Sequence, residues 1–171
     1  MINEEYLSVI DATNFKVTKP YGYSILEYKN RYGGYENFTA CLIGYFNDCD
    51  GCNYNTCFNN LVYGDVLVIG LGLGLIPEYI RQNKNYTTID VVEDDPELVE
   101  YVDYLHEDIN IISTSDCEAY SGTKKYDLII LEYYGDVDDI TPNKMTNLYT
   151  PQLKDDGVMI WPLTNKIIRH A

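Results

Sequence analysis

A glycine-rich turn is the first feature of this sequence whose residue types point to chemistry. It reads Gly70-Leu71-Gly72-Leu73-Gly74 and directly follows the apolar run from Asp65 to Ile69. Glycine adopts positive φ angles and has no Cβ, so a bound molecule can approach the backbone at such a turn. The residues from Ile76 onward read as a helix, whose free N–H groups and dipole would face the turn. A glycine turn also serves close packing of a strand against a helix, so the pattern alone leaves both interpretations open.

The spacing of the glycines separates two kinds of nucleotide ligand. A dinucleotide fingerprint has the form G-x-G-x-x-G, but Leu75 stands where its third glycine is required after Gly70. The observed form is G-x-G-x-G. This spacing favours a ligand in which an adenosyl group carries an amino acid over a ligand with a pyrophosphate.

Carboxylates follow the next predicted strand. Glu93 lies 23 residues after Gly70, directly after the run from Thr87 to Val92. A carboxylate at that strand end is placed to accept hydrogen bonds from both ribose hydroxyls of an adenosine. Asp94 or Asp95 is suited to cap the following helix, and Asp94 is also counted with the candidate ligand residues.

Asp116 and Cys117 follow the third predicted strand of this region, Ile109 to Ser113. We expect the Asp116 carboxylate to accept a hydrogen bond from the amino group of an adenine. The backbone N–H of Cys117 would donate a hydrogen bond to the adenine ring. A solvent-exposed acidic turn is the alternative for Asp116. Open α/β sheets bind ligands at the carboxyl ends of their strands, so three such ends together support one nucleoside site.

Alternating strands and helices would position these residues. Beyond Gly64, strands are expected at 65–69, 87–92, 109–113, 126–131 and 157–162, and helices at 76–82, 96–105 and 143–153. This alternation predicts an α/β, Rossmann-like domain over residues 63–171 with a mostly parallel sheet that ends after its fifth strand. The open edge of that sheet predicts a homodimer or another homo-oligomer. Residues 1–62 predict a small antiparallel sheet and a Cys-rich connector.

The composition limits the class of protein. The 171 residues include 12 Lys and Arg against 27 Asp and Glu, a net charge of −15, and 46% are hydrophobic. This acidity disfavours binding to nucleic acid and would attract a cationic small molecule, although it also serves solubility. No apolar run is long enough to cross a membrane, and the start of the sequence has no secretory signal. The sequence therefore predicts a soluble cytoplasmic protein.

The cysteines raise the question of a metal. Four of the five, Cys41, Cys49, Cys52 and Cys57, are close in the sequence, and Cys49-x-x-Cys52 has the spacing of half a zinc knuckle. A second such pair and a nearby histidine are missing, so burial as small apolar side chains is favoured. No metal site is predicted, and zinc stays the alternative.

Residues 64–161 resemble the core of the class I S-adenosylmethionine-dependent methyltransferases, and within that superfamily most closely the polyamine (spermidine/spermine) synthase-like proteins. The motifs that carry the resemblance are VLVIG at 66–70 with the glycine turn, VEDDPELV at 92–99, DCE at 116–118, YDLIIL at 126–131 and LKDDGV at 153–158. The runs YKNRYG at 28–33 and LIG at 42–44 are similar to the hairpin that precedes the synthase core.

The resemblance implies a transferase that uses S-adenosylmethionine or its decarboxylated form and acts on a small acceptor, with amines among the candidates. It assigns the amino-acid end of the ligand to the three glycines, the ribose to Glu93, and the adenine to Asp116 and Cys117. After the fourth strand, Glu132 and Asp136 are the candidate catalytic bases, and Glu132 and Tyr133 are also counted with the ligand residues.

The same segment departs from the synthase pattern. Synthases carry an Asp, two residues, a second Asp that acts as base, and a Pro, whereas this sequence reads Glu132-Tyr133-Tyr134-Gly135-Asp136. Methyl transfer and aminopropyl transfer therefore both stay open. An adenosyl-binding or regulatory module that has lost its catalytic loop is the alternative to an enzyme.

Overall fold

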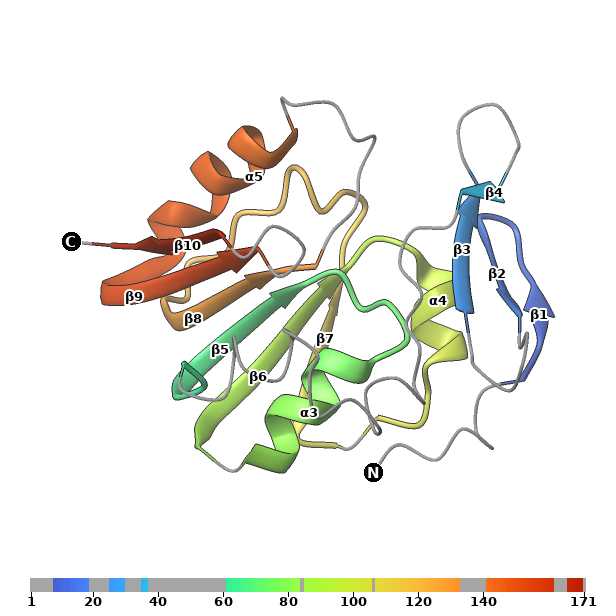
Figure 1. Cartoon of the computed structure of the whole chain (residues 1–171), viewed down its shortest axis with the longest axis horizontal. Coiled ribbons are helices and arrows are strands. Elements are labelled where there is room, and N and C mark those ends of the chain that lie inside the picture. Colours follow the sequence, from blue (N-terminus) through green and yellow to red (C-terminus); the bar gives the residue numbers. More distant parts are fainter. Residues whose placement is uncertain are drawn as a thin grey trace.

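The computed structural model describes residues 8–18, 25–29, 35–36, 61–83, 85–105, 107–132, 141–161 and 166–170. Two sheets organise them (Figure 1). The four-stranded antiparallel sheet has the order β1-β2-β3-β4, with β1 at Ile10–Asp11, β2 at Phe15–Thr18, β3 at Ile25–Lys29 and β4 at Tyr35–Glu36. The six-stranded sheet has the order β10-β9-β8-β5-β6-β7.

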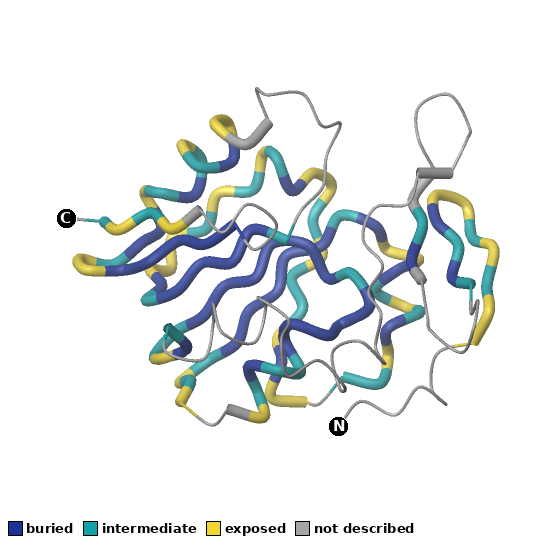
Figure 2. The backbone as a smooth tube through the Cα atoms, in the orientation of Figure 1, coloured by how far each residue is buried: buried dark blue, intermediate teal, exposed yellow. Residues whose placement is uncertain are grey.

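The large sheet is mostly parallel. Its parallel strands are β5 (Gly64–Ile69), β6 (Tyr86–Glu93), β7 (Ile109–Ser113), β8 (Tyr126–Leu131) and β9 (Leu153–Trp161). The central residues of β5, β6, β8 and β9 are buried, as Figure 2 shows, because helices or loops cover both faces of a parallel sheet, whereas those of the edge strand β7 are partly exposed. The α/β fold class and the Rossmann-like core are confirmed. The strand order reverses beside β5, which lies between β6 and β8, and such a switch point is where open α/β sheets bind ligands.

The sequence predicted a large sheet that ends after its fifth strand. This prediction is wrong. A sixth strand, β10 (Lys166–Arg169), pairs antiparallel with β9 and covers its edge. β10 reads Lys-Ile-Ile-Arg, which does not alternate between polar and apolar residues, so no strand pattern reveals it. Two predicted helices are also shorter than expected.

The first of these helices, α4, is Pro96–Tyr101 instead of 96–105. The second, α5, is Thr141–Tyr149, after which Thr150–Gln152 form a 3-10 turn, η3, and β9 begins at Leu153. Pro151 explains the second correction, because a proline in a helix interior removes a backbone hydrogen bond.

The helices divide between the two faces of the large sheet (Figure 1). α3 (Leu75–Asn83) and α4 supply Ile80 and Leu98 to a buried cluster with the strand residues Val66 and Val68. α5 supplies Met145 and Tyr149 to a second cluster with the intervening strand residues, among them Leu67 and Ile69. Successive side chains of each strand point to opposite faces of the sheet, so they are buried in two separate clusters.

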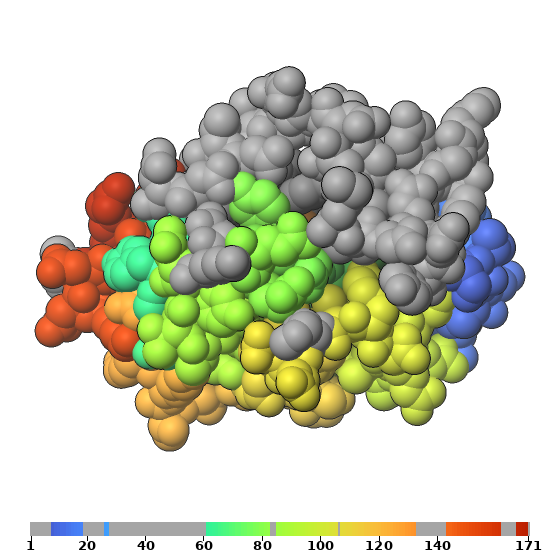
Figure 3. All heavy atoms as spheres, turned by 90° about the horizontal axis from the view of Figure 1, so that it is seen from below, coloured from blue at the N-terminus to red at the C-terminus, as the bar shows by residue number. Residues whose placement is uncertain are grey.

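The small sheet packs against α4. The ring of Phe15 meets the ring of Tyr101 edge-on, with centroids 5.9 Å apart. Thr13 donates through its backbone N–H and its hydroxyl to the two carboxylate oxygens of Glu97, at 2.8 and 2.9 Å. Figure 3 shows the N-terminal strands (blue) and the C-terminal strands (red) at opposite ends of the molecule. The expected N-terminal antiparallel sheet is present, with β1 as an additional strand that the sequence did not reveal.

Two expectations about the N-terminal region lie outside the described residues. They concern the run LIG at 42–44, which is similar to the synthase hairpin, and the Cys-rich connector. In the part of the chain that is described, no helix combines the length and hydrophobicity that a membrane span requires.

Candidate functional site

The glycine turn forms a tight bend at the carboxyl end of β5. Gly70, Gly72 and Gly74 have φ angles of 92°, 52° and 73°, a region that other residues adopt only with strain. The Gly70 N–H donates to Val92 O at 2.8 Å, so the turn starts between β5 and β6. The Gly74 N–H donates to Leu71 O at 2.9 Å and closes the bend directly before α3. These positive φ angles explain why the turn carries glycine at all three positions, as the sequence predicted.

Gly74 has a packing role in addition. A Cβ at this position would lie 2.9 Å from side-chain carbons of both Val102 and Leu105, which follow α4. The Tyr104 hydroxyl donates to Leu73 O in the same place. The absence of a side chain at Gly74 therefore lets the start of α3 approach the segment after α4.

Glu93 ends β6 with its carboxylate directed at backbone N–H groups. Oε2 accepts from Leu71 of the glycine turn at 2.8 Å, and Oε1 accepts from Asp94 and Asp95 at 2.9 Å each. The residue is only 4% exposed. Burial raises the pKa of Glu93 to about 7, despite the hydrogen bond from Leu71. The carboxylate thus adjoins the glycine turn as predicted, and it can change charge near neutral pH.

Asp94 and Asp95 have separate roles. Asp95 is the N-cap of α4, since its Oδ1 accepts from Glu97 N at 3.0 Å and from Leu98 N at 3.3 Å. Of the two expected cap candidates, Asp95 is the one used. Asp94 Oδ2 accepts from the Cys117 N–H at 3.0 Å and so links the tip of β6 to the loop after β7.

The loop after β7 contains the residues predicted to contact an adenine. Asp116 is exposed, and its Oδ1 accepts from Glu118 N at 2.7 Å. Cys117 is fully buried, with Sγ 3.7 Å from Val92 O. Burial, together with the nearby Asp94 and Glu93 carboxylates, raises the pKa of the Cys117 thiol, which is therefore an unreactive thiol. Its N–H, expected to face a ligand ring, is directed at Asp94.

Glu132 directly follows β8 at the same edge of the sheet. Its backbone N–H donates to Ile69 O at 2.8 Å, so it lies beside the end of β5 and is half-buried. The other two candidates of this segment, Tyr133 and Asp136, lie outside the described residues. Backbone contacts thus bring Glu93, Asp94, Cys117 and Glu132 to one edge of the sheet, around the glycine turn.

Two contacts at this edge were not predicted from the sequence. Leu71 is recognised only as part of the glycine turn, yet its N–H donates to Glu93 Oε2. Tyr149 of α5 donates through its hydroxyl to Cys117 O at 2.7 Å. In a chain with 18 tyrosines, no sequence signal distinguishes Tyr149 from the others.

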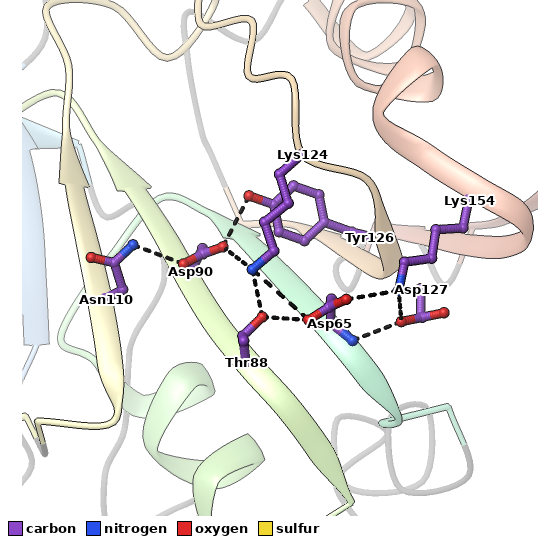
Figure 4. A network of polar contacts seen from close by, with 8 residues as sticks. All are labelled: Asp65, Thr88, Asp90, Asn110, Lys124, Tyr126, Asp127 and Lys154. Carbon is purple, nitrogen blue, oxygen red and sulfur yellow. Dashed lines mark hydrogen bonds and ion pairs between the residues drawn. The ribbon is translucent and has the colours of Figure 1, made fainter.

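A second group of polar side chains crosses the sheet away from this edge (Figure 4). Its members are joined by hydrogen bonds and ion pairs and are Asp65, Thr88, Asp90, Asn110, Lys124, Tyr126, Asp127 and Lys154. Asp65, Asp127 and Lys154 are each the second residue of their strand, so they mark the amino-terminal ends. The positive and negative groups pair with one another and belong to neighbouring strands, except that Lys124 lies just before β8. The network therefore links these strands.

Metal ligands are the remaining question at the level of side chains. Within the described residues, no group of three or more His, Cys, Asp or Glu side chains is arranged to bind a metal ion. Cys41, Cys49, Cys52 and Cys57, the zinc alternative, lie outside that part of the chain.

Solved structures with this architecture include methyltransferases by name. A methyltransferase from Clostridium acetobutylicum ATCC 824 matches with a TM-score of 0.52 and 20% identity, over 68% of this chain and 51% of that one. The plantazolicin methyltransferase BpumL, solved with a triazolic desmethylPZN analog and SAH, matches with 0.51 and 19%, over 68% and 49%. The fold is a methyltransferase fold.

A third structure extends the comparison. DhpI, in a complex with SAM and HEP, matches with a TM-score of 0.55 and 13% identity, over 70% of this chain and 56% of that one. The chain therefore spans about half the length of these proteins. None of the three is a polyamine synthase by name. No protein-family model and no curated protein matches the sequence.

Proposed function

We propose that the chain binds S-adenosylmethionine at the carboxyl ends of β5, β6 and β7 and transfers its methyl group to a small acceptor. The observation that carries the proposal is the buried Glu93 carboxylate, which lies against the glycine turn at the switch point of a methyltransferase fold. In this arrangement Gly70 and Gly72 line the amino-acid end of the ligand, Glu93 accepts from the ribose hydroxyls, and Asp116 accepts from the adenine.

The chemistry demands little beyond alignment and removal of a proton. A nucleophile of the acceptor attacks the methyl carbon, the carbon–sulfur bond breaks, and S-adenosylhomocysteine leaves as a neutral thioether. The acceptor loses a proton to a base, for which we propose Glu132, beside the end of β5, with Asp136 as the second candidate. The net charge of −15 favours an acceptor that is cationic.

Methyl transfer is favoured over aminopropyl transfer. Gly135 stands where the polyamine synthases carry their base, and the matched structures include methyltransferases by name. Turnover of S-adenosylmethionine and of its decarboxylated form, each labelled and offered with a panel of amines and peptides, distinguishes the two reactions. Binding without any product would support the alternative of a regulatory module.

The Glu93→Ala variant tests the ligand site directly. It removes the carboxylate that would accept the ribose hydroxyls, so calorimetry should show S-adenosylhomocysteine binding weakened by roughly 1–3 kcal/mol. Glu100→Ala, at an exposed position of α4, removes the same charge and should bind like the wild type. Equal affinities of wild type and Glu93→Ala would refute the assignment of the ribose to Glu93.

A further inference from the structure

The hydroxyl of Tyr149 reaches across the sheet face to the loop after β7. Tyr149 is the last residue of α5, is fully buried, and donates to Cys117 O at 2.7 Å. Burial raises the pKa of Tyr149, so the hydroxyl keeps its proton and is a donor at neutral pH. The contact joins residues 32 positions apart.

Cys117 is fixed from the opposite side as well. Its N–H donates to Asp94 Oδ2 at 3.0 Å, and its buried Sγ lies near Val92 O. The peptide groups before and after Cys117 are therefore tied to two different elements, the tip of β6 and the end of α5. A loop that is bonded at both of these groups has little freedom to shift.

A third contact reinforces the same connection nearer to solvent. Lys144 Nζ lies 2.6 Å from Glu118 Oε2, so α5 contacts two consecutive residues of the loop. The Lys144 side chain is 52% exposed, and ion pairs of that exposure contribute little. The buried Tyr149 contact is therefore the one expected to set the position of the loop.

We propose that Tyr149 is a positioning residue for the adenine side of the nucleoside site. The inference rests on the proposed function, because it needs Asp116 to face an adenine. Tyr149 itself does not contact the ligand. It fixes the Cys117 carbonyl, and through it the adjoining Asp116, whose exposed carboxylate accepts from the amino group of an adenine but repels the oxo group of a hypoxanthine. Tyr149 thus contributes to recognition of the base.

The test compares two ligands that differ only in the base, S-adenosylhomocysteine and S-inosylhomocysteine, by calorimetry. Tyr149→Phe removes the hydroxyl and keeps the ring. It should weaken binding of the adenosyl ligand about fivefold to tenfold and leave binding of the inosyl ligand within about twofold. Tyr101→Phe is the control, because it also removes a hydroxyl that donates to a backbone carbonyl, that of Ser8 at 2.6 Å, but in an exposed contact. It should leave the ratio of the two affinities unchanged.

The outcomes separate the two proposals. If the wild type binds neither ligand, the proposed function fails, and the inference fails with it. If the wild type prefers the adenosyl ligand and Tyr149→Phe keeps that preference, only the positioning role is overturned. A lower melting temperature without a change in the ratio would also overturn it, because that is the signature of a purely structural contact.

A second measurement keeps the inference testable if Tyr149→Phe does not fold. Amide hydrogen exchange of the wild-type protein should show that S-adenosylhomocysteine protects the loop around Cys117 and also the end of α5. S-Inosylhomocysteine should protect the end of α5 less. Equal protection of α5 by both ligands would contradict the coupling.

Discussion

Glu93 combines deep burial with a carboxylate that receives three backbone N–H groups. Its pKa of about 7 lies above the ordinary value of 4.5 because burial disfavours the charged form. The folded state therefore binds a proton more tightly than the unfolded state. The stability from this proton is fully present below about pH 4.5 and is lost as the pH rises through about 7.

The free energy of unfolding should accordingly fall by roughly 2–3 kcal/mol between pH 5 and pH 8 through this one residue. Glu93→Gln cannot ionise, so its stability should change less over the same range, whatever its absolute value. Urea unfolding at several pH values measures both slopes, and Glu100→Gln should keep the wild-type slope. If the unfolding free energies of the wild type and Glu93→Gln changed in parallel with pH, Glu93 would be ionised over the whole range from about pH 5 to pH 8.

At the scale of the elements, the polar network of Figure 4 connects strands on one face of the large sheet. Its centre is Asp90, which is 6% exposed. Burial opposes ionisation of Asp90, but hydrogen bonds from Lys124, Asn110 and Tyr126 outweigh it and lower its pKa. The carboxylate is therefore charged at neutral pH and depends on these donors, of which Lys124 Nζ, at 2.8 Å, carries the compensating charge.

Lys124→Met should destabilise the protein by roughly 1–3 kcal/mol at pH 7, because a buried carboxylate loses its countercharge. The lowered pKa of Asp90 stabilises the folded protein above the ordinary value of 3.8, and this stabilisation is lost in acid. The difference in unfolding free energy between wild type and Lys124→Met should therefore shrink below about pH 4. Lys125→Met removes the same charge from the neighbouring exposed position and should cost less than about 0.5 kcal/mol. Denaturant unfolding at pH 7 and pH 3 compares the three proteins. An equal loss of unfolding free energy in both lysine variants would mean that the change in net charge, and not the loss of the Asp90 countercharge, causes the effect.

The elements also show what a sequence can reveal. The strands at 109–113 and 126–131 have the predicted bounds. The second is a largely apolar run that is mostly buried, as expected of an inner parallel strand, whereas the first is an edge strand with partly exposed residues. The cap at Asp95 was within the predicted pair, since an acidic residue before Pro96 has few other local uses. β10 was missed because Lys-Ile-Ile-Arg does not alternate between polar and apolar residues. The contact from Tyr149 to Cys117 depends on how α5 packs, and no local pattern encodes a contact across 32 residues.

At the scale of the whole molecule, the N-terminal sheet shares a core with the Rossmann-like part. Phe15, Val17 and Leu26 are buried in the same cluster as Val66, Ile80 and Leu98. The sequence predicted a boundary at 62/63, and β5 begins at Gly64. A common core means that the two parts should unfold together, whereas two independent domains would unfold in separate steps.

The single tryptophan, Trp161, makes this testable, because it ends β9 and is buried in the cluster that does not contain Phe15. Phe15→Ala empties a fully buried site that contacts Tyr101 and should cost about 3–5 kcal/mol. If the molecule is one cooperative unit, Trp161 fluorescence and far-UV circular dichroism will report the same lowered midpoint. Val9→Ala, at a position that is 68% exposed, should change neither signal. A Trp161 midpoint that stays at the wild-type value in Phe15→Ala would instead show that residues 63–171 fold without the N-terminal sheet.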